Sequence, residues 1–159
     1  MKNNWNIDEI QAAWHLASRL HNGQKYGGHL QNEKIEYINH IGSVTFEILN
    51  SLQFCRYENA NLAIKCAILH DTIEDTAFDY EQTLLHFGKK VADGVLALTK
   101  SENLDTKQAR MQDSLQRIKQ QPHEIWSVKM ADRIVNLYAP PYYCQIGCGF
   151  KRSCLLLRK

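Results

Sequence analysis

Residues 62–76 read LAIKCAILHDTIEDT, an apolar run that ends in a cluster of polar side chains. The apolar part has hydrophobic residues on most sides of a helix, which is typical of a buried helix rather than an amphipathic surface helix. We therefore predict a central helix over about residues 59–74. The polar part begins with His70, at the point where this helix nears its end.

The rest of the chain also has helical periodicity, with little proline and with glycines between the periodic segments. Residues 22–36 are polar, aperiodic and contain glycine, so we predict a loop there. The expected fold is an all-α, single-domain helical bundle over residues 1–140. Besides the central helix, the expected helices span about residues 6–21, 38–52, 79–87, 89–99, 106–121 and 122–137.

Composition narrows the class of protein. The chain has 159 residues, 44% of them hydrophobic, which fits one domain with a sizeable core. Its 19 basic and 17 acidic residues give a net charge of +2, which is too balanced to indicate a nucleic-acid binder. No apolar run approaches the roughly 18–20 residues that span a bilayer, and the N-terminus has no apolar signal core. Five cysteines without a CxxC pair do not indicate a disulfide framework. We therefore expect a cytoplasmic protein that binds neither nucleic acid nor a membrane.

The polar cluster at the end of the central helix predicts a metal site. His70, Asp71, Glu74 and Asp75 share one small volume, because residues three and four apart lie on the same face of a helix. The three carboxylates repel one another and are costly to remove from water without a partner. A divalent cation resolves this conflict, because it supplies the missing positive charge.

Two more side chains are placed to complete that site. His40 lies in YINH, and Asp132 lies in VKMADRIVNL, where apolar surroundings make a free carboxylate unexpected. Asn136 follows Asp132 by one turn on the same face. Mixed nitrogen and oxygen ligation suits Mn, Fe or Zn better than Ca or Mg. Such a metal would make a coordinated water acidic enough to act as a nucleophile near neutral pH. The acidic pair, Glu74 and Asp75, would then act as acid and base beside it.

Simpler structural roles stay open for each of these residues. The pair of His70 and Asp71 can cap a helix end, and a lone His40 is more often structural than a ligand. Asp132 can pair with a basic neighbour such as Lys129. The acidic pair can form an ordinary surface turn, although acids at a helix C-terminus oppose its dipole. The other histidines have no acidic cluster beside them and are expected to be structural or exposed: His15, His21, His29, His86 and His123.

Four segments together resemble the HD-domain hydrolases of the RelA/SpoT type, including the small stand-alone alarmone hydrolases. They are YINH (37–40), AILHDTIEDT (67–76), LLHFGKKVADGVLALTK (84–100) and VKMADRIVNL (128–137). The resemblance spans roughly residues 8–140, and HDTIED followed by ADRIVNL is its specific part.

This resemblance implies an all-helical, Mn-dependent hydrolase that removes the 3′-pyrophosphate from ppGpp or pppGpp and releases GDP or GTP. It also implies residue roles by motif. The metal ligands would be His40, His70, Asp71 and Asp132. The acidic pair, Glu74 and Asp75, would be catalytic, and Asn136 would contact the nucleotide, a small-molecule substrate.

The sequence departs from the family on the substrate side. The family carries an Arg-Lys pair where this chain reads GQKYGG, residues 23–28. Lys25 can still meet a phosphate and Tyr26 can stack on a base, but the guanidinium is absent. Ile41 also replaces the proline that follows the family histidine. Two alternatives therefore stay open: an HD-type phosphohydrolase of another nucleotide or sugar phosphate, and a catalytically silent, metal-stabilised regulatory module.

The last residues differ from the rest of the chain. Residues 144–159 read CQIGCGFKRSCLLLRK, with three cysteines, four basic residues and no acid. No fourth ligand stands at a zinc-like spacing from these cysteines. The family chain usually continues with another helix here. We therefore expect residues 141–159 to form an atypical tail, with a truncated or altered reading frame.

Overall fold

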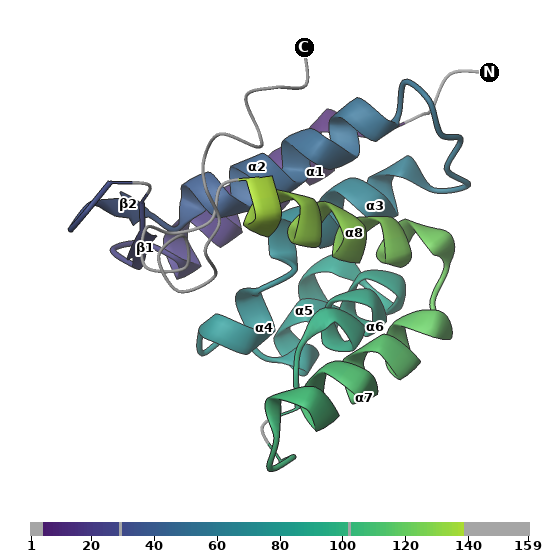
Figure 1. The fold of residues 1–159 in the computed structure, drawn as a ribbon. Coiled ribbons are helices and arrows are strands. Elements are labelled where there is room, and N and C mark those ends of the chain that lie inside the picture. Colours follow the sequence, from purple (N-terminus) through teal and green to yellow (C-terminus); the bar gives the residue numbers. More distant parts are fainter. Residues whose placement is uncertain (1–4, 29, 102, 139–159) are drawn as a thin grey trace.

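The computed structural model describes residues 5–28, 30–101 and 103–138. The predicted tail, residues 141–159, lies outside these ranges. Figure 1 shows helices stacked into a bundle, with a small hairpin on one side. In chain order the elements are α1 (Ile7–Leu20), β1 (Lys25–Gly27), β2 (Lys34–Glu36), α2 (Ile38–Ser51), α3 (Ala60–Leu69), α4 (Thr72–Asp75), α5 (Tyr80–Phe87), α6 (Lys89–Leu98), α7 (Lys107–Lys119) and α8 (His123–Tyr138). The predicted all-α bundle is confirmed.

Helix α3 is the centre of the bundle, as its apolar sequence predicts. It packs against α1, α2, α6 and α8. Most of its side chains are buried, and Ala63, Ile64, Cys66 and Leu69 have no exposed surface. Helix α7 contacts α6 and α8 and lies at the end of the bundle opposite α1 and α2 (Figure 1). Among the described residues, none of the helices combines the length and the apolar character needed to cross a membrane.

The prediction of one uninterrupted helix to residue 74 was wrong. The helix ends at Leu69, and the separate turn α4 begins at Thr72. Two side chains take the carbonyl groups that a continuing helix would use: His70 Nδ1 lies 2.8 Å from the Ala67 oxygen, and Thr72 Oγ1 donates to the Leu69 oxygen at 2.7 Å. Such side-chain bonds compete with helical ones. At the break, His70 is buried and Asp71 is partly buried.

The segment predicted as a loop contains a short hairpin. Strands β1 and β2 pair antiparallel, with Lys25 opposite Glu36 and Tyr26 opposite Ile35. Each strand has only three residues, which is too short to show the alternation that predicts a strand. The hairpin carries Tyr26 to the end of the bundle where α2 begins.

Helices α3, α6 and α8 approach one another closely at Gly94 of α6. A Cβ atom there would lie 2.6 Å from Ile125 Cδ1 and 3.0 Å from Cys66 Sγ, and both partners are fully buried. We expect Gly94→Ala to lower the free energy of unfolding by about 1–3 kcal/mol relative to Gly42→Ala. Gly42 lies in α2, where a Cβ meets only Trp14 at 3.6 Å. Both substitutions raise helix propensity by the same amount. The difference between the two variants in the free energy of unfolding, measured by urea denaturation, therefore reports the cost of the close contacts at Gly94. Equal stabilities would contradict a rigid contact at this point.

Candidate metal centre

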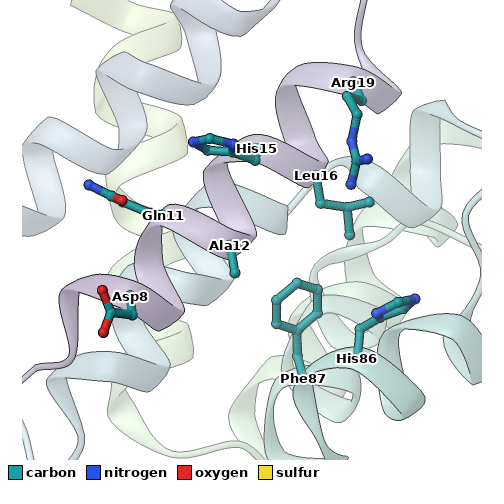
Figure 2. Close-up of a pocket in the computed structure, with 8 residues that line it drawn as sticks. All are labelled: Asp8, Gln11, Ala12, His15, Leu16, Arg19, His86 and Phe87. Atoms are coloured by element: carbon teal, nitrogen blue, oxygen red, sulfur yellow. The ribbon is translucent and has the colours of Figure 1, made fainter.

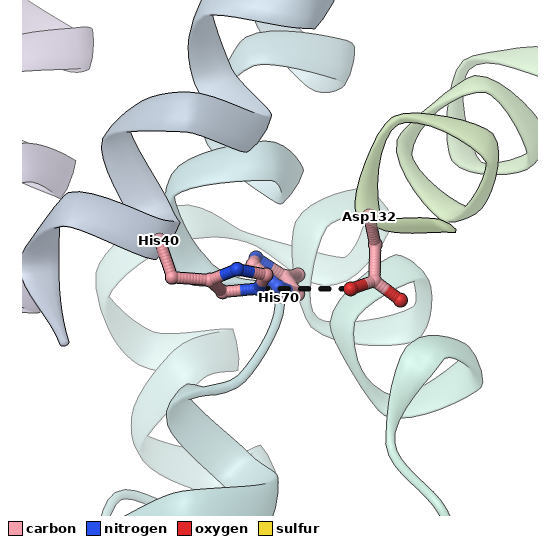
Figure 3. A group of neighbouring side chains, drawn as sticks. All are labelled: His40, His70 and Asp132. Atoms are coloured by element: carbon pink, nitrogen blue, oxygen red, sulfur yellow. Dashed lines mark ion pairs between the residues drawn. The ribbon is translucent and has the colours of Figure 1, made fainter. Parts of the chain in front are cut away.

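The four predicted metal ligands come from separate parts of the chain and lie close together. His40 comes from the first turn of α2, His70 and Asp71 from the break between α3 and α4, and Asp132 from α8. Figure 3 shows the rings of His40 and His70 and the carboxylate of Asp132 pointing toward one another. One nitrogen or oxygen atom from each of these three side chains lies within 4.8 Å of the others, and all three residues are buried.

Asp71 completes the group through contacts with both imidazole rings. Its Oδ2 lies 2.9 Å from His70 Nε2 and 3.7 Å from His40 Nε2. The Tyr37 hydroxyl donates a hydrogen bond to the same oxygen at 2.5 Å. This bond fixes the carboxylate in place, as hydrogen bonds behind metal ligands commonly do. The sequence analysis did not assign Tyr37 to the site. Tyr37 lies three residues before His40 and therefore on the same side of the chain as it enters α2.

His70 presents a nitrogen lone pair to the centre of the group. Its Nδ1 faces the Ala67 carbonyl at 2.8 Å, and a carbonyl only accepts, so Nδ1 carries the proton. The opposite nitrogen, Nε2, is buried and lies in an ion-pair contact with Asp71 Oδ2 at 2.9 Å, but it makes no hydrogen bond among the described residues. Burial lowers the pKa of His70, but the charge of Asp71 outweighs burial and raises the pKa to about 9. A proton and a cation therefore compete for the same Nε2 lone pair.

Asp132 is held by partners on both of its oxygens. Oδ1 lies 3.6 Å from His40 Nε2 and accepts a hydrogen bond from Asn136 Nδ2 at 2.6 Å. Oδ2 accepts from the buried Lys129 at 3.1 Å. Burial raises the pKa of Asp132, but the interactions with His40, Lys129 and His70 outweigh burial and lower the pKa to about 2. Asp132 therefore pairs with its basic neighbour Lys129, as the simpler structural role predicted, but through Oδ2. Its Oδ1 still faces the imidazoles.

This donor set fits a divalent cation. Burial raises the pKa of Asp71, but His70, Tyr37 and His40 outweigh burial and hold the pKa well below its usual range. Two charged carboxylates and two imidazole nitrogens therefore face one buried volume. Neutral imidazoles with carboxylates are the ligands that Mn, Fe and Zn prefer. Such an ion would coordinate the buried Nε2 of His70, which makes no hydrogen bond within the described part of the chain.

The amino-acid sequence of the chain is similar to those of curated enzymes. The guanosine-3′,5′-bis(diphosphate) 3′-pyrophosphohydrolase MESH1 of Danio rerio is 30% identical over 122 residues, which cover 77% of this chain and 63% of the relative. MESH1 of Xenopus tropicalis is 31% identical over 111 residues, which cover 66% of this chain and 56% of the relative. The chain thus spans about three fifths of the length of these relatives. No protein-family model matches the chain.

A solved structure has the same fold. It is described as a metazoan orthologue of SpoT that hydrolyses ppGpp and plays a role in starvation responses. It matches with a TM-score of 0.70 and 22% identity, over 94% of this chain and 79% of that chain. The chain therefore resembles hydrolases of the RelA/SpoT type in sequence and shares their fold. The resemblance carried by the sequence motifs is thereby confirmed.

The acidic pair lies on α4, directly after His70 and Asp71. Glu74 Oε1 accepts from Lys100 Nζ at 2.6 Å, and its Oε2 accepts from the Lys100 backbone N–H at 3.0 Å. Burial raises the pKa of Asp75, and the charges of Asp71 and Glu74 raise it further. The two carboxyl groups therefore differ. Glu74 is paired with the Lys100 ammonium, whereas the raised pKa of Asp75 favours its protonated form.

A buried histidine at the C-terminal cap of α1 is linked to the acidic pair through Gln24, and the sequence did not predict this link. His21 is 2% exposed, and its ring centre lies 5.1 Å from that of Tyr37. Its Nδ1 lies 2.7 Å from Gln24 Oε1, and Gln24 Nε2 donates to the Asp75 carbonyl at 2.8 Å. The predicted structural role of His21 fits these contacts. Nothing in the local sequence indicates this link, because Gln24 and Asp75 are 51 residues apart.

The structure also places the residues that the sequence assigned to substrate. Lys25 Nζ forms an ion pair with Glu36 at 2.9 Å across the hairpin, and both side chains are about half exposed. Tyr26 lies edge-on to Tyr37 and His40, with ring centres 5.9 Å and 6.3 Å apart. Tyr26 is therefore beside the metal centre, whereas Lys25 is engaged with an acid. Asn136 reaches the centre through its bond to Asp132.

A surface cavity of about 450 Å³ lies elsewhere, between α1 and α5. Figure 2 shows its eight lining residues, with Phe87 and His86 facing α1. The cavity shares no residue with the metal centre or with the acidic pair. The cavity is therefore separate from the candidate metal centre.

Proposed function

We propose that the protein is a Mn-dependent hydrolase that acts in the cytoplasm and removes the 3′-diphosphate of ppGpp or pppGpp. The observation that carries the proposal is the buried group of His40, His70, Asp71 and Asp132 with an acidic pair beside it. The matched relatives named as 3′-pyrophosphohydrolases support the substrate. Fe and Zn are the alternative metals, because the same nitrogen and oxygen donors bind them.

The reaction needs one nucleophile and two proton transfers. The oxygen of water forms a bond to the phosphorus next to the 3′ oxygen, and the bond between that phosphorus and the 3′ oxygen breaks. Water loses a proton, the 3′ oxygen gains one, and the products are pyrophosphate and GDP or GTP. A divalent cation at the four ligands supplies Lewis acidity, which makes water more acidic and offsets phosphate charge.

The side chains of the acidic pair divide the proton transfers. Asp75 has a raised pKa, so its carboxyl group is suited to give a proton to the departing 3′ oxygen. Glu74 is oriented by two bonds to Lys100 and is suited to orient water and take its proton. Tyr37 keeps Asp71 aligned, and Asn136 keeps Asp132 aligned.

On the substrate side, we assign base stacking to Tyr26 and a nucleotide contact to Asn136. Tyr26 lies beside His40, so a base on its ring would be close to the metal centre. Lys25 would meet a phosphate only after releasing Glu36. The ion pair between Lys25 and Glu36 favours a second candidate function. This is a phosphohydrolase with the same metal centre that acts on another nucleotide or sugar phosphate.

The decisive experiment is metal analysis of the purified protein, followed by product analysis with ppGpp and added Mn. We expect one divalent ion per chain and release of GDP with pyrophosphate. Turnover of another nucleotide or sugar phosphate, with ppGpp untouched, would select the second candidate. Bound metal without turnover of any compound in such a panel would overturn the hydrolase and indicate a regulatory module.

A further inference from the structure

Gln24 connects three segments of the chain around the acidic pair. It lies between the end of α1 and the start of the hairpin. Its side-chain Nε2 donates a hydrogen bond to the Asp75 carbonyl at 2.8 Å, and its Oε1 lies 2.7 Å from His21 Nδ1. Its backbone carbonyl accepts from the Tyr37 N–H at 2.9 Å, directly before α2. The residue therefore joins the end of α1, the start of α2 and the turn α4.

The partners of the Gln24 amide fix its orientation. A backbone carbonyl only accepts hydrogen bonds, so the amide nitrogen faces Asp75 and the amide oxygen faces His21. His21 Nδ1 therefore carries the proton and donates it to Gln24. The histidine itself is buried, and its ring packs against that of Tyr37. A buried imidazole thus holds the amide oxygen, and the amide nitrogen holds the backbone of Asp75.

The turn α4 depends on such external bonds for its position. It has four residues, Thr72–Asp75, and the carbonyl groups at the C-terminal end of a helix have no partner inside it. On one side, Lys100 holds the Glu74 carboxylate. The Gln24 amide holds the last carbonyl of the turn. Because the Asp75 N–H donates to the Asp71 carbonyl at 2.8 Å, a shift of this turn would displace Asp75 relative to a metal ligand.

We propose that Gln24 and His21 are positioning residues, which hold the Asp75 carboxyl group where it can give a proton to the departing 3′ oxygen. The inference rests on the proposed function, because that function assigns the proton transfer to Asp75. A small misplacement of a reacting group can slow a reaction strongly. Metal binding should not depend on either side chain. The bond from Tyr37, which aligns Asp71, goes to the backbone carbonyl of Gln24 and survives a change of side chain.

A matched pair of glutamine variants tests the first residue. Gln24→Leu removes both amide bonds at a position that is only partly buried, so the variant should fold. Gln53→Leu is the control, because Gln53 is exposed just after α2 and its amide bonds only to the nearby Asn50. We expect Gln24→Leu to lower kcat for ppGpp about tenfold, as loss of a buried hydrogen bond typically does, with KM and metal content within about twofold. Gln53→Leu should change none of these quantities.

Two substitutions of the histidine separate positioning from packing. His21→Leu fills much of the space of the ring but removes the donor to Gln24. His21→Asn is smaller, but it places an amide N–H near the position of Nδ1. Positioning therefore predicts a loss of kcat in His21→Leu and recovery of most of the rate in His21→Asn. Packing alone predicts the reverse order, because asparagine leaves more of the buried space empty. Equal losses in the two variants would remove His21 from the positioning role.

Hydrogen exchange of the α4 backbone provides a measurement that does not need activity. We expect faster exchange over residues 72–76 in Gln24→Leu and His21→Leu, with exchange in α3 unchanged. If ppGpp is not hydrolysed but α4 exchanges faster, the proposed function fails and the bond network around α4 stands. If ppGpp is hydrolysed and Gln24→Leu changes neither exchange nor kcat, the positioning roles fail and the hydrolase stands. Faster exchange with an unchanged kcat would also overturn the proposal, because the network would then be only structural.

Discussion

His70→Ala is expected to abolish both the bound metal and ppGpp hydrolysis. The variant removes the buried Nε2, which lies 2.9 Å from Asp71 Oδ2, and thus takes away one of the four proposed ligands. Loss of a hydrogen bond behind a metal ligand typically costs about 10- to 100-fold in metal affinity, so loss of a ligand should cost more than about a hundredfold. Elemental analysis and turnover of ppGpp by the purified variant measure the two effects separately.

The matched control for His70→Ala is His15→Ala. His15 is exposed on α1 and belongs to the cavity that is separate from the metal centre. This variant should keep the metal and the rate of the unmodified protein. The circular dichroism spectrum of His70→Ala should remain helical, because the substitution changes none of the residues of the hydrophobic core. A folded His70→Ala protein that retained a stoichiometric metal ion would remove His70 from the ligand set.

The helical bundle could be predicted because its signals are local. The apolar sides of α3 and the caps of the helices lie within single segments, as at Asn59, whose side chain accepts from the Leu62 N–H. The break after Leu69 could not be predicted, because it depends on whether the side chains of His70 and Thr72 bind carbonyls or solvent. The hairpin was missed because three residues per strand leave no period to detect.

The candidate site was predictable in part for the same reason. His70 and Asp71 are adjacent, and the apolar context of Asp132 marked a carboxylate that needs a partner. The ion pairs on the substrate side were not foreseen. Lys100 is 26 residues from Glu74, and only the packing of α6 against α4 brings them together. Local patterns therefore predicted the groups that carry chemistry, and tertiary packing decided which cations accompany them.

Glu74→Gln is expected to keep the metal and lose turnover. Glu74 bonds to Lys100 rather than to any of the four ligand side chains, so its loss should leave metal content unchanged. The amide keeps the size of the side chain and one acceptor for Lys100, but it cannot take a proton. Loss of a positioned acid or base typically slows a reaction by about 10²- to 10⁴-fold, and kcat for ppGpp should fall within that range. Glu81→Gln, at an exposed position of α5, serves as the charge-matched control.

A second variant decides whether Glu74 acts on the reaction or only holds Lys100. Lys100→Met removes the ammonium and leaves the Glu74 carboxylate bound to the backbone N–H. If Glu74 transfers the proton, Lys100→Met should lower kcat much less than Glu74→Gln does. Equal losses of kcat in the two variants would instead make Glu74 a positioning residue for Lys100. Full activity in Glu74→Gln would exclude both roles, and the proton transfers would then pass to Asp75, whose raised pKa already suits it to hold a proton.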